Sequence, residues 1–145
     1  MIYFDTSSLA KAYIEEVRSA DVDRFLELQT DRVGISDLSV LEMRSTVARK
    51  AREGRFDDVT AARIWSTFQA DINDGLFDVI SAASGDFSLA TRMMDRVAPL
   101  PLKTLDALHL AIAERVEALG FVTSDKQQLN AANALGFKTT SFLPD

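Results

Sequence analysis

The chain has 145 residues, of which 47% are hydrophobic and 26% are charged. This length and composition suit one globular domain, and we predict that residues 1–145 form a single domain. The formal net charge of −6 argues against tight non-specific binding to nucleic acid, because such affinity comes mainly from lysine and arginine neutralising phosphates. The absence of cysteine excludes disulfides, zinc–thiolate sites and cysteine nucleophiles, so a bound metal would need oxygen ligands or the single histidine.

No apolar run is long enough to span a bilayer, and the first apolar strand pattern begins at Ile2, which leaves no basic leader ahead of it. We therefore expect a cytoplasmic protein that does not enter membranes. In chain order, apolar spacing predicts strand 2–4, helix 7–14, helix 19–29, strand 33–36, helix 38–54, helix 57–73, strand 77–80, helix 86–97, helix 104–119, strand 121–123, helix 126–135 and strand 137–141. Strands that alternate with helices in this way predict an α/β fold with a mostly parallel central sheet and helices on both faces, a three-layer α/β/α arrangement.

Four acidic residues share one local setting, in which an apolar strand or a loop gives way to a helix. They are Asp5, Glu42, Asp106 and Asp125. If the strands are parallel, these acids gather beyond the carboxyl edge of the sheet, where open α/β sheets bind ligands. Carboxylate oxygens are the ligands that Mg²⁺ and Mn²⁺ prefer, and such ions assist the hydrolysis of phosphodiesters. The pattern therefore predicts a metal-dependent phosphodiesterase site.

Each of these acids also has a structural explanation. Asp5 and Asp125 are placed to cap the helices that follow them, and Asp106 would complement the dipole of a first helical turn. Ser39 and Glu42 have the spacing of a capping box. Four acids at one edge of a sheet would nevertheless repel one another strongly unless a cation or several donors offset their charge. Their convergence favours the functional interpretation.

Other polar residues near these acids allow two interpretations each. Lys11 lies close to Asp5 in sequence, and Arg49 follows Glu42 by seven residues on almost the same helix face, so both are candidates for positioning a phosphate. The basic stretch around Arg49 would also suit an ordinary solvated helix. His109 follows Asp106 by three residues, but its apolar neighbours favour a packed or hydrogen-bonded structural residue over a metal ligand.

Four segments in this order resemble the PIN-domain ribonucleases, and more narrowly the VapC-type toxins. They are MIYFDTSSLAKAY at 1–13, LSVLE at 38–42, TLDALHLA at 104–111 and VTSD at 122–125. The resemblance implies a PIN-like fold and a metal-dependent endoribonuclease that forms homodimers and is silenced by a cognate antitoxin protein. Position by position, it implies that the four acids bind Mg²⁺ or Mn²⁺ and that Ser7 and Thr123 support them.

Two other functions remain open on the sequence. A small-molecule phosphohydrolase could use the same edge of a similar sheet, although the aspartyl-phosphate type would want a second acid at position 7, where this chain has serine. A non-catalytic binding domain could keep the acids as caps. For the ribonuclease, we expect an antitoxin to insert an arginine or lysine among the acids. We expect the antitoxin contact to extend over an apolar groove formed by Leu9, Tyr13, Phe56, Trp65 and Phe68. The alternative is that these five residues belong to the core.

Overall fold

The central sheet has five strands in the order β3-β2-β1-β4-β5, and every neighbouring pair is parallel. The structure, a computed structural model, describes residues 1–144. The strands are β1 (Ile2–Phe4), β2 (Val33–Ser36), β3 (Phe77–Ile80), β4 (Gly120–Thr123) and β5 (Thr139–Ser141). The predicted mostly parallel sheet is thus confirmed, and it is parallel throughout.

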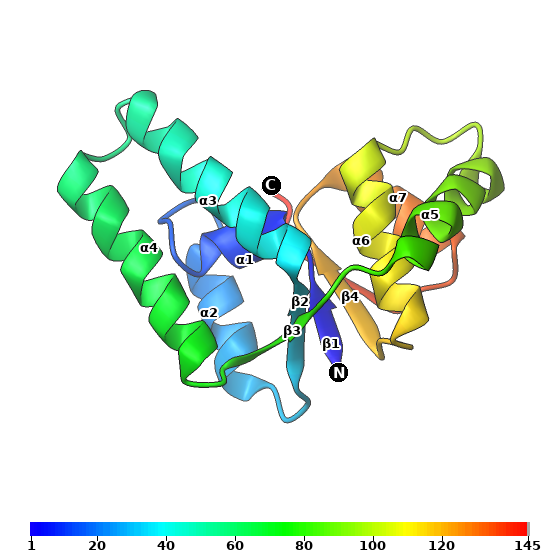
Figure 1. Cartoon of the computed structure of the whole chain (residues 1–145), viewed down its shortest axis with the longest axis horizontal. Helices are drawn as coiled ribbons and strands as arrows, with labels where there is room; N and C mark the ends of the chain where they lie inside the picture. The colour runs from blue at the N-terminus through cyan, green and yellow to red at the C-terminus, as the bar shows by residue number, and fades with distance from the viewer. Residues whose placement is uncertain (145) are drawn as a thin grey trace.

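Seven helices cover the two faces of this sheet (Figure 1). They are α1 (Thr6–Lys11), α2 (Ser19–Leu28), α3 (Asp37–Arg52), α4 (Asp58–Asn73), α5 (Ser84–Val97), α6 (Thr104–Arg115) and α7 (Lys126–Ala134). The first four helices pack on one face and the last three on the other, which gives the three-layer α/β/α arrangement. None of the helices within residues 1–144 is both long and apolar enough to cross a membrane.

Successive side chains of the central strands point to opposite faces of the sheet, so each face has a separate hydrophobic core. In β1, Tyr3 packs with α5, α6 and α7, whereas Phe4 packs with α1 to α4. In β4, Phe121 likewise packs on the side of α5, α6 and α7, and Val122 on the side of α1 to α4. All four side chains are fully buried, as expected for parallel strands that are covered on both faces.

Several elements are shorter than the sequence predicts, and backbone hydrogen bonds explain two of them. The helix predicted at 104–119 ends at Arg115, because Glu117 adopts a left-handed conformation and the amide of Ala118 turns back to the carbonyl of Ala113. The strand predicted at 137–141 begins only at Thr139, because the amide of Phe137 still closes the end of α7. The helix predicted at 7–14 ends at Lys11.

The strand order places a crevice between β1 and β4. From β1 the chain builds outward through β2 and β3 on one side, and β4 and β5 complete the other side. The connections at the carboxyl ends of β1 and β4 therefore diverge, which is the geometry that opens a ligand site in such sheets. Asp5 directly follows β1 and Asp125 lies two residues beyond β4, so both flank this crevice.

Candidate active site

All four predicted acids line one cleft at the carboxyl ends of β1 and β4, with a volume of about 500 Å³. They come from four different places in the fold. Asp5 precedes α1, Glu42 lies in the second turn of α3, Asp106 lies in the first turn of α6, and Asp125 precedes α7. Residues that are 120 positions apart in sequence thus face the same cavity because the strands that carry them are neighbours.

Asp5 is the most firmly held of the four acids. Its side chain accepts a hydrogen bond from the backbone amide of Ser8, so it does cap α1. The hydroxyl of Ser7 lies 2.7 Å from Oδ1, and that of Thr123 lies 3.0 Å from Oδ2. Asp5 is only 3% exposed, and this burial raises the pKa of its carboxyl to about 6 despite the surrounding donors. Capping and a place in the cleft are therefore compatible roles for one residue.

Glu42 is bound through a single carboxylate oxygen. Thr6 donates its hydroxyl hydrogen to Oε1 at 2.8 Å, and Nε2 of His109 makes a short hydrogen bond to the same oxygen. Burial alone would raise the pKa of Glu42, but the hydrogen bond and charge of His109 lower it below its usual value. The suggested capping box of Ser39 and Glu42 is not formed, because Ser39 pairs instead with the N-cap residue Ser36.

Asp106, at the start of α6, and Asp125, just before α7, line the same part of the fold and influence each other electrostatically. Asp125 accepts a hydrogen bond from the amide of Gln128 at 2.8 Å and so caps α7. The buried side-chain amide of Gln128 in turn donates to the carbonyl of Asp106 at 3.3 Å. Burial, and then the negative charge of Asp125, raise the pKa of the Asp106 carboxyl. Like charges are therefore held close together in this part of the cleft.

The donor set of the cleft suits a hard divalent cation. Four carboxylates supply only oxygen, which is the ligand type that Mg²⁺ and Mn²⁺ prefer. Within residues 1–144, however, no three acidic or histidine side chains are placed so that they could hold one ion as they stand. Glu42 is turned toward Thr6 and His109, and Asp125 toward its capping contact.

Four basic side chains line the cleft beside the acids, and they differ in how freely they project. Lys11 is buried, and its ammonium group contacts the carbonyl of Val17 and, with Lys50, the carboxylate of Glu16. Arg49 is about half exposed and pairs with Glu53 at 3.4 Å. The fourth is Lys103. Of the two proposed phosphate contacts, Arg49 is therefore available to a ligand, whereas Lys11 is engaged within the protein.

Three residues that lie around the cleft were not identified from the sequence. Thr6 and Tyr3 flank the motif residue Asp5 but carry no pattern of their own, and each contacts His109 only through the tertiary fold. Glu16 lies in an irregular segment after α1, and nothing in its local sequence distinguishes it from the other acids. The sequence signal that comes closest is the apolar setting of His109, which correctly indicates a buried, hydrogen-bonded histidine.

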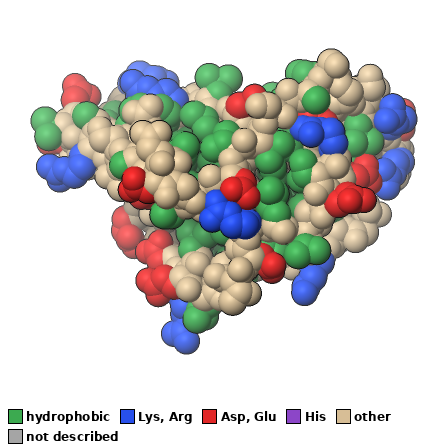
Figure 2. Space-filling model, turned by 60° about the horizontal axis from the view of Figure 1, so that its bottom comes forward, with side chains coloured by type: hydrophobic (Ala, Val, Ile, Leu, Met, Phe, Trp, Pro, Cys, Tyr) green, Lys and Arg blue, Asp and Glu red, His purple; other side chains and the backbone are tan. Residues whose placement is uncertain are grey.

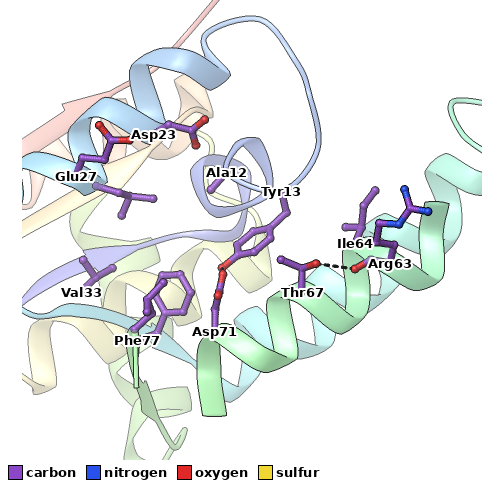
Figure 3. Close-up of a pocket in the computed structure, with 12 residues that line it drawn as sticks. Ala12, Tyr13, Asp23, Glu27, Val33, Arg63, Ile64, Thr67, Asp71 and Phe77 are labelled. Atoms are coloured by element: carbon purple, nitrogen blue, oxygen red, sulfur yellow. Dashed lines mark hydrogen bonds between the residues drawn. The ribbon is translucent and has the colours of Figure 1, made fainter. Parts of the chain in front are cut away.

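A second cavity of about 510 Å³ opens between α2 and α4 (Figure 3). Tyr13 stands at its centre and donates a hydrogen bond to Asp71 at 2.5 Å. Apolar side chains of α2, α4 and β3 form much of its wall, whereas Leu9 and Phe68 are fully buried and belong to the core. Of the five residues that the sequence suggested for an apolar groove, Tyr13 alone lines this cavity. Phe56 does not line it, and Trp65 lines a separate pocket together with Arg44 and Ala61.

The face shown in Figure 2 carries acidic and basic side chains interspersed among hydrophobic ones. No single large basic patch dominates this view, in keeping with the net charge of −6.

The fold and the acidic cleft are those of an established family. A family model for the PIN domain matches residues 2–134, and the chain belongs to this family. Ribonuclease VapC47 of Mycobacterium tuberculosis (strain CDC 1551 / Oshkosh) is 32% identical over 146 residues, which cover 97% of this chain and 96% of the relative. The chain is thus a homologue of the VapC ribonucleases.

Several solved structures share this fold. VapC20 of Mycobacterium tuberculosis, described as a toxin that cleaves the Sarcin-Ricin loop, superposes with a TM-score of 0.72 at 18% identity, covering 94% of this chain and 96% of that one. VapBC2 of Rickettsia felis, solved with a DNA fragment from its promoter, gives a TM-score of 0.67 at 12% identity, with coverages of 97% and 98%. At these identities the likeness shows the shared fold.

Proposed function

We propose that this protein is a metal-dependent endoribonuclease and the toxin of a toxin–antitoxin pair. The observation that carries the proposal is the convergence of Asp5, Glu42, Asp106 and Asp125 on one cleft of a PIN-domain fold. The similarity to a VapC ribonuclease along nearly the whole chain supports the same reaction. We expect the protein to act in the cytoplasm, in keeping with the absence of cysteine.

The four acids are the residues that would hold Mg²⁺ or Mn²⁺. When bound, such an ion lowers the pKa of a water molecule and offsets charge on the phosphate during hydrolysis. The chain's own contribution is to hold the ligand side chains in position. Ser7 and Thr123 orient Asp5 from both of its oxygens, and Thr6 and His109 hold one oxygen of Glu42. Segment 126–130 supplies no further acid, so we expect one firmly bound ion and a second that arrives with the substrate.

The basic side chains of the cleft would orient the RNA backbone. Arg49 is exposed at the rim, and Lys103 lies close to Asp106 in sequence within the same cavity. A guanidinium group matches the two oxygens of a phosphate with its planar fork of donors. These contacts fix the position of the strand without reading its sequence.

The direct test is cleavage of a labelled RNA oligonucleotide by the purified chain, prepared free of any partner, with Mg²⁺ or Mn²⁺ present. We expect internal cleavage that stops when EDTA removes the cation. Release of phosphate from small monoesters without cleavage of RNA would instead favour a phosphohydrolase. Metal binding or partner binding without any hydrolysis would favour a non-catalytic domain.

An antitoxin partner would use both cavities. Asp5, Glu42 and Asp106 offer an arginine or lysine a site of strong negative potential, and the cavity between α2 and α4 offers apolar wall to an amphipathic segment. The VapBC2 structure, which shares this fold, is an antitoxin complex bound to a DNA fragment. The homodimer implied by the family resemblance stays a prediction, and sedimentation of the purified chain will test it.

A further inference from the structure

His109 lies at the centre of a buried chain of hydrogen bonds that ends on Glu42. Its Nδ1 is 2.7 Å from the hydroxyl oxygen of Tyr3, and that oxygen is 3.0 Å from the hydroxyl of Ser36. Ser36 is the N-cap of α3 and exchanges hydrogen bonds with Ser39. This series of hydrogen bonds thus runs from Ser36 at the start of α3, through Tyr3 of β1, to His109 of α6, and returns to α3 at Glu42. Of these residues only Glu42 is more than 1% exposed.

The hydrogen on His109 Nε2 is required by its partner. Nε2 lies within hydrogen-bonding distance of Oε1 of Glu42, and it does so without any other side chain between them. An ionised carboxylate only accepts hydrogen bonds, so Nε2 must carry a hydrogen. Both the charged ring and the neutral ring with hydrogen on Nε2 satisfy this condition. Tyr3 accommodates either form, because a hydroxyl both donates and accepts.

The contacts divide the two oxygens of Glu42 between different tasks. Oε1 accepts hydrogen bonds from His109 and from Thr6, whereas no described residue bonds to Oε2. The cleft also contains the other three acids. One oxygen is therefore held by the protein and the other is left for a ligand.

We propose that His109 is a positioning residue, which holds Oε1 of Glu42 so that Oε2 is presented to a divalent cation, with Tyr3 locking the imidazole ring from behind. This inference rests on the proposed metal-dependent function of the cleft. Partners that orient a metal-binding side chain typically contribute about 10- to 100-fold to metal affinity or activity. His109 touches neither the RNA nor the reacting atoms in this role.

Packing around the ring gives the arrangement its rigidity. His109 is 1% exposed, and its ring meets that of Tyr3 edge to face at a centroid distance of 5.9 Å. Tyr3 is itself stacked on Phe121 of β4 at 5.6 Å. Neither ring can turn without disturbing the core between the sheet and α6. A side chain held in this way can fix the position of Glu42 before a cation binds.

The first measurement is nitrogen NMR of the imidazole, which is unambiguous because the chain contains one histidine. We expect Nε2 of His109 to carry a hydrogen in the metal-free protein. A neutral ring with its hydrogen on Nδ1 would overturn the proposal. Tyr3→Phe removes the hydroxyl but keeps the stacked ring, and we expect it to shift the Nδ1 resonance. Tyr13→Phe, which removes the other tyrosine hydroxyl of the chain, should leave both resonances unchanged.

The second measurement is the affinity for Mn²⁺ in the absence of RNA. The amide nitrogen of glutamine reaches about as far as Nε2, whereas that of asparagine does not. We therefore expect His109→Asn to weaken Mn²⁺ binding by about 10- to 100-fold and His109→Gln to recover most of this loss. Equal affinities for wild type, His109→Asn and His109→Gln would overturn the positioning role.

Two further comparisons keep the result decisive. If His109→Asn does not fold, Thr6→Val removes the other donor to Oε1, and its Mn²⁺ affinity should fall for the same reason. Unchanged affinity in a folded Thr6→Val would contradict the division of the two oxygens. RNA cleavage by wild type is measured in parallel. Cation binding that depends on His109 without any RNA cleavage would overturn the proposed ribonuclease but not the role of His109.

Discussion

The hydroxyl of Thr123 lies 3.0 Å from Oδ2 of Asp5 and thereby joins the ends of the two central strands, β4 and β1. The same hydroxyl is 2.9 Å from Oε1 of the buried Gln128, so it also connects Asp5 to α7. One side chain thus relates the best-held acid of the cleft to the helix that Asp125 caps. Its loss should affect the site more than the fold.

We expect Thr123→Val, which keeps the shape but removes the hydroxyl, to lower Mg²⁺ affinity or RNA cleavage by about 10- to 100-fold. Loss of the buried hydrogen bond should lower the free energy of unfolding by about 1–2 kcal/mol. The matched control is Thr139→Val on β5, where an exposed hydroxyl bonds to Asn133 at 2.7 Å. Activity and chemical denaturation measured on both variants check the prediction. An equal loss of activity in the two would contradict it.

Asp5→Asn should abolish RNA cleavage while leaving the protein folded. Asparagine caps a helix about as well as aspartate, so the start of α1 is preserved while the charge for the cation is lost. Asp95→Asn, at an exposed acid of α5, is the control. Cleavage assays and circular dichroism give the two readouts. Normal metal-dependent cleavage by a folded Asp5→Asn would remove Asp5 from the site.

Arg49 and Lys11 should respond differently to replacement by methionine. Because Arg49 is exposed in the cleft, Arg49→Met should weaken RNA binding. It should also reduce by about one the magnitude of the slope of log K for RNA binding plotted against the logarithm of the salt concentration. Lys11 is buried against Glu16, so Lys11→Met should mainly lower stability. Arg52→Met, on the same helix but outside the cleft, is the control. Binding titrations at several salt concentrations will separate these cases. Identical effects of Arg49→Met and Arg52→Met would contradict a substrate contact.

The ion pair of Asp86 and Arg115, which joins α5 to α6, should make stability depend on pH. Arg115 meets both oxygens of Asp86, at 2.7 and 3.1 Å. Burial alone would raise the pKa of Asp86, but hydrogen bonds from Arg115 and a backbone amide lower it below the usual value of 3.8. A lowered folded pKa means that the stabilisation is present above the unfolded pKa and is lost as pH falls through the folded one.

We therefore expect Asp86→Asn to lower the free energy of unfolding at pH 7 by about 1–3 kcal/mol. The difference from wild type should shrink as the pH falls below the usual value of 3.8, where Asp86 of the wild type becomes protonated. Glu114→Gln is the matched control, because Glu114 pairs with Arg96 between the same two helices at an exposed site. Urea denaturation from pH 7 down to pH 3 gives the comparison. A difference that persists unchanged at pH 3 would contradict the assigned ion pair.

Inhibition by the antitoxin should depend on basic residues of the partner. The test is a complex with the gene product encoded beside this chain, with each arginine and lysine of the partner's contact segment replaced in turn. We expect inhibition to weaken most for the residue that enters the cleft near Asp5 and Asp106. Full inhibition by a partner that approaches none of the four acids would show that the cleft is not the contact.

Much of the fold follows from local sequence, because alternating strands and amphipathic helices carry periodic apolar patterns. The ends of elements are less predictable. The turn at Glu117 that ends α6 is a backbone conformation that no residue type at that position demands. Likewise, Ser36 rather than Ser39 caps α3, and both serines fit the local pattern equally well.

The sequence by itself determined the order of strands and helices, the four acids at their junctions and the family to which those motifs belong. It did so because each of these features depends on residues that are close together in the sequence. Only the tertiary structure decided which oxygens are held and which are left for a ligand. The contacts of Glu42 with Thr6 and His109 join residues 36 and 67 positions apart. Such contacts depend on how sheet and helices pack, and packing brings together residues that no local pattern relates.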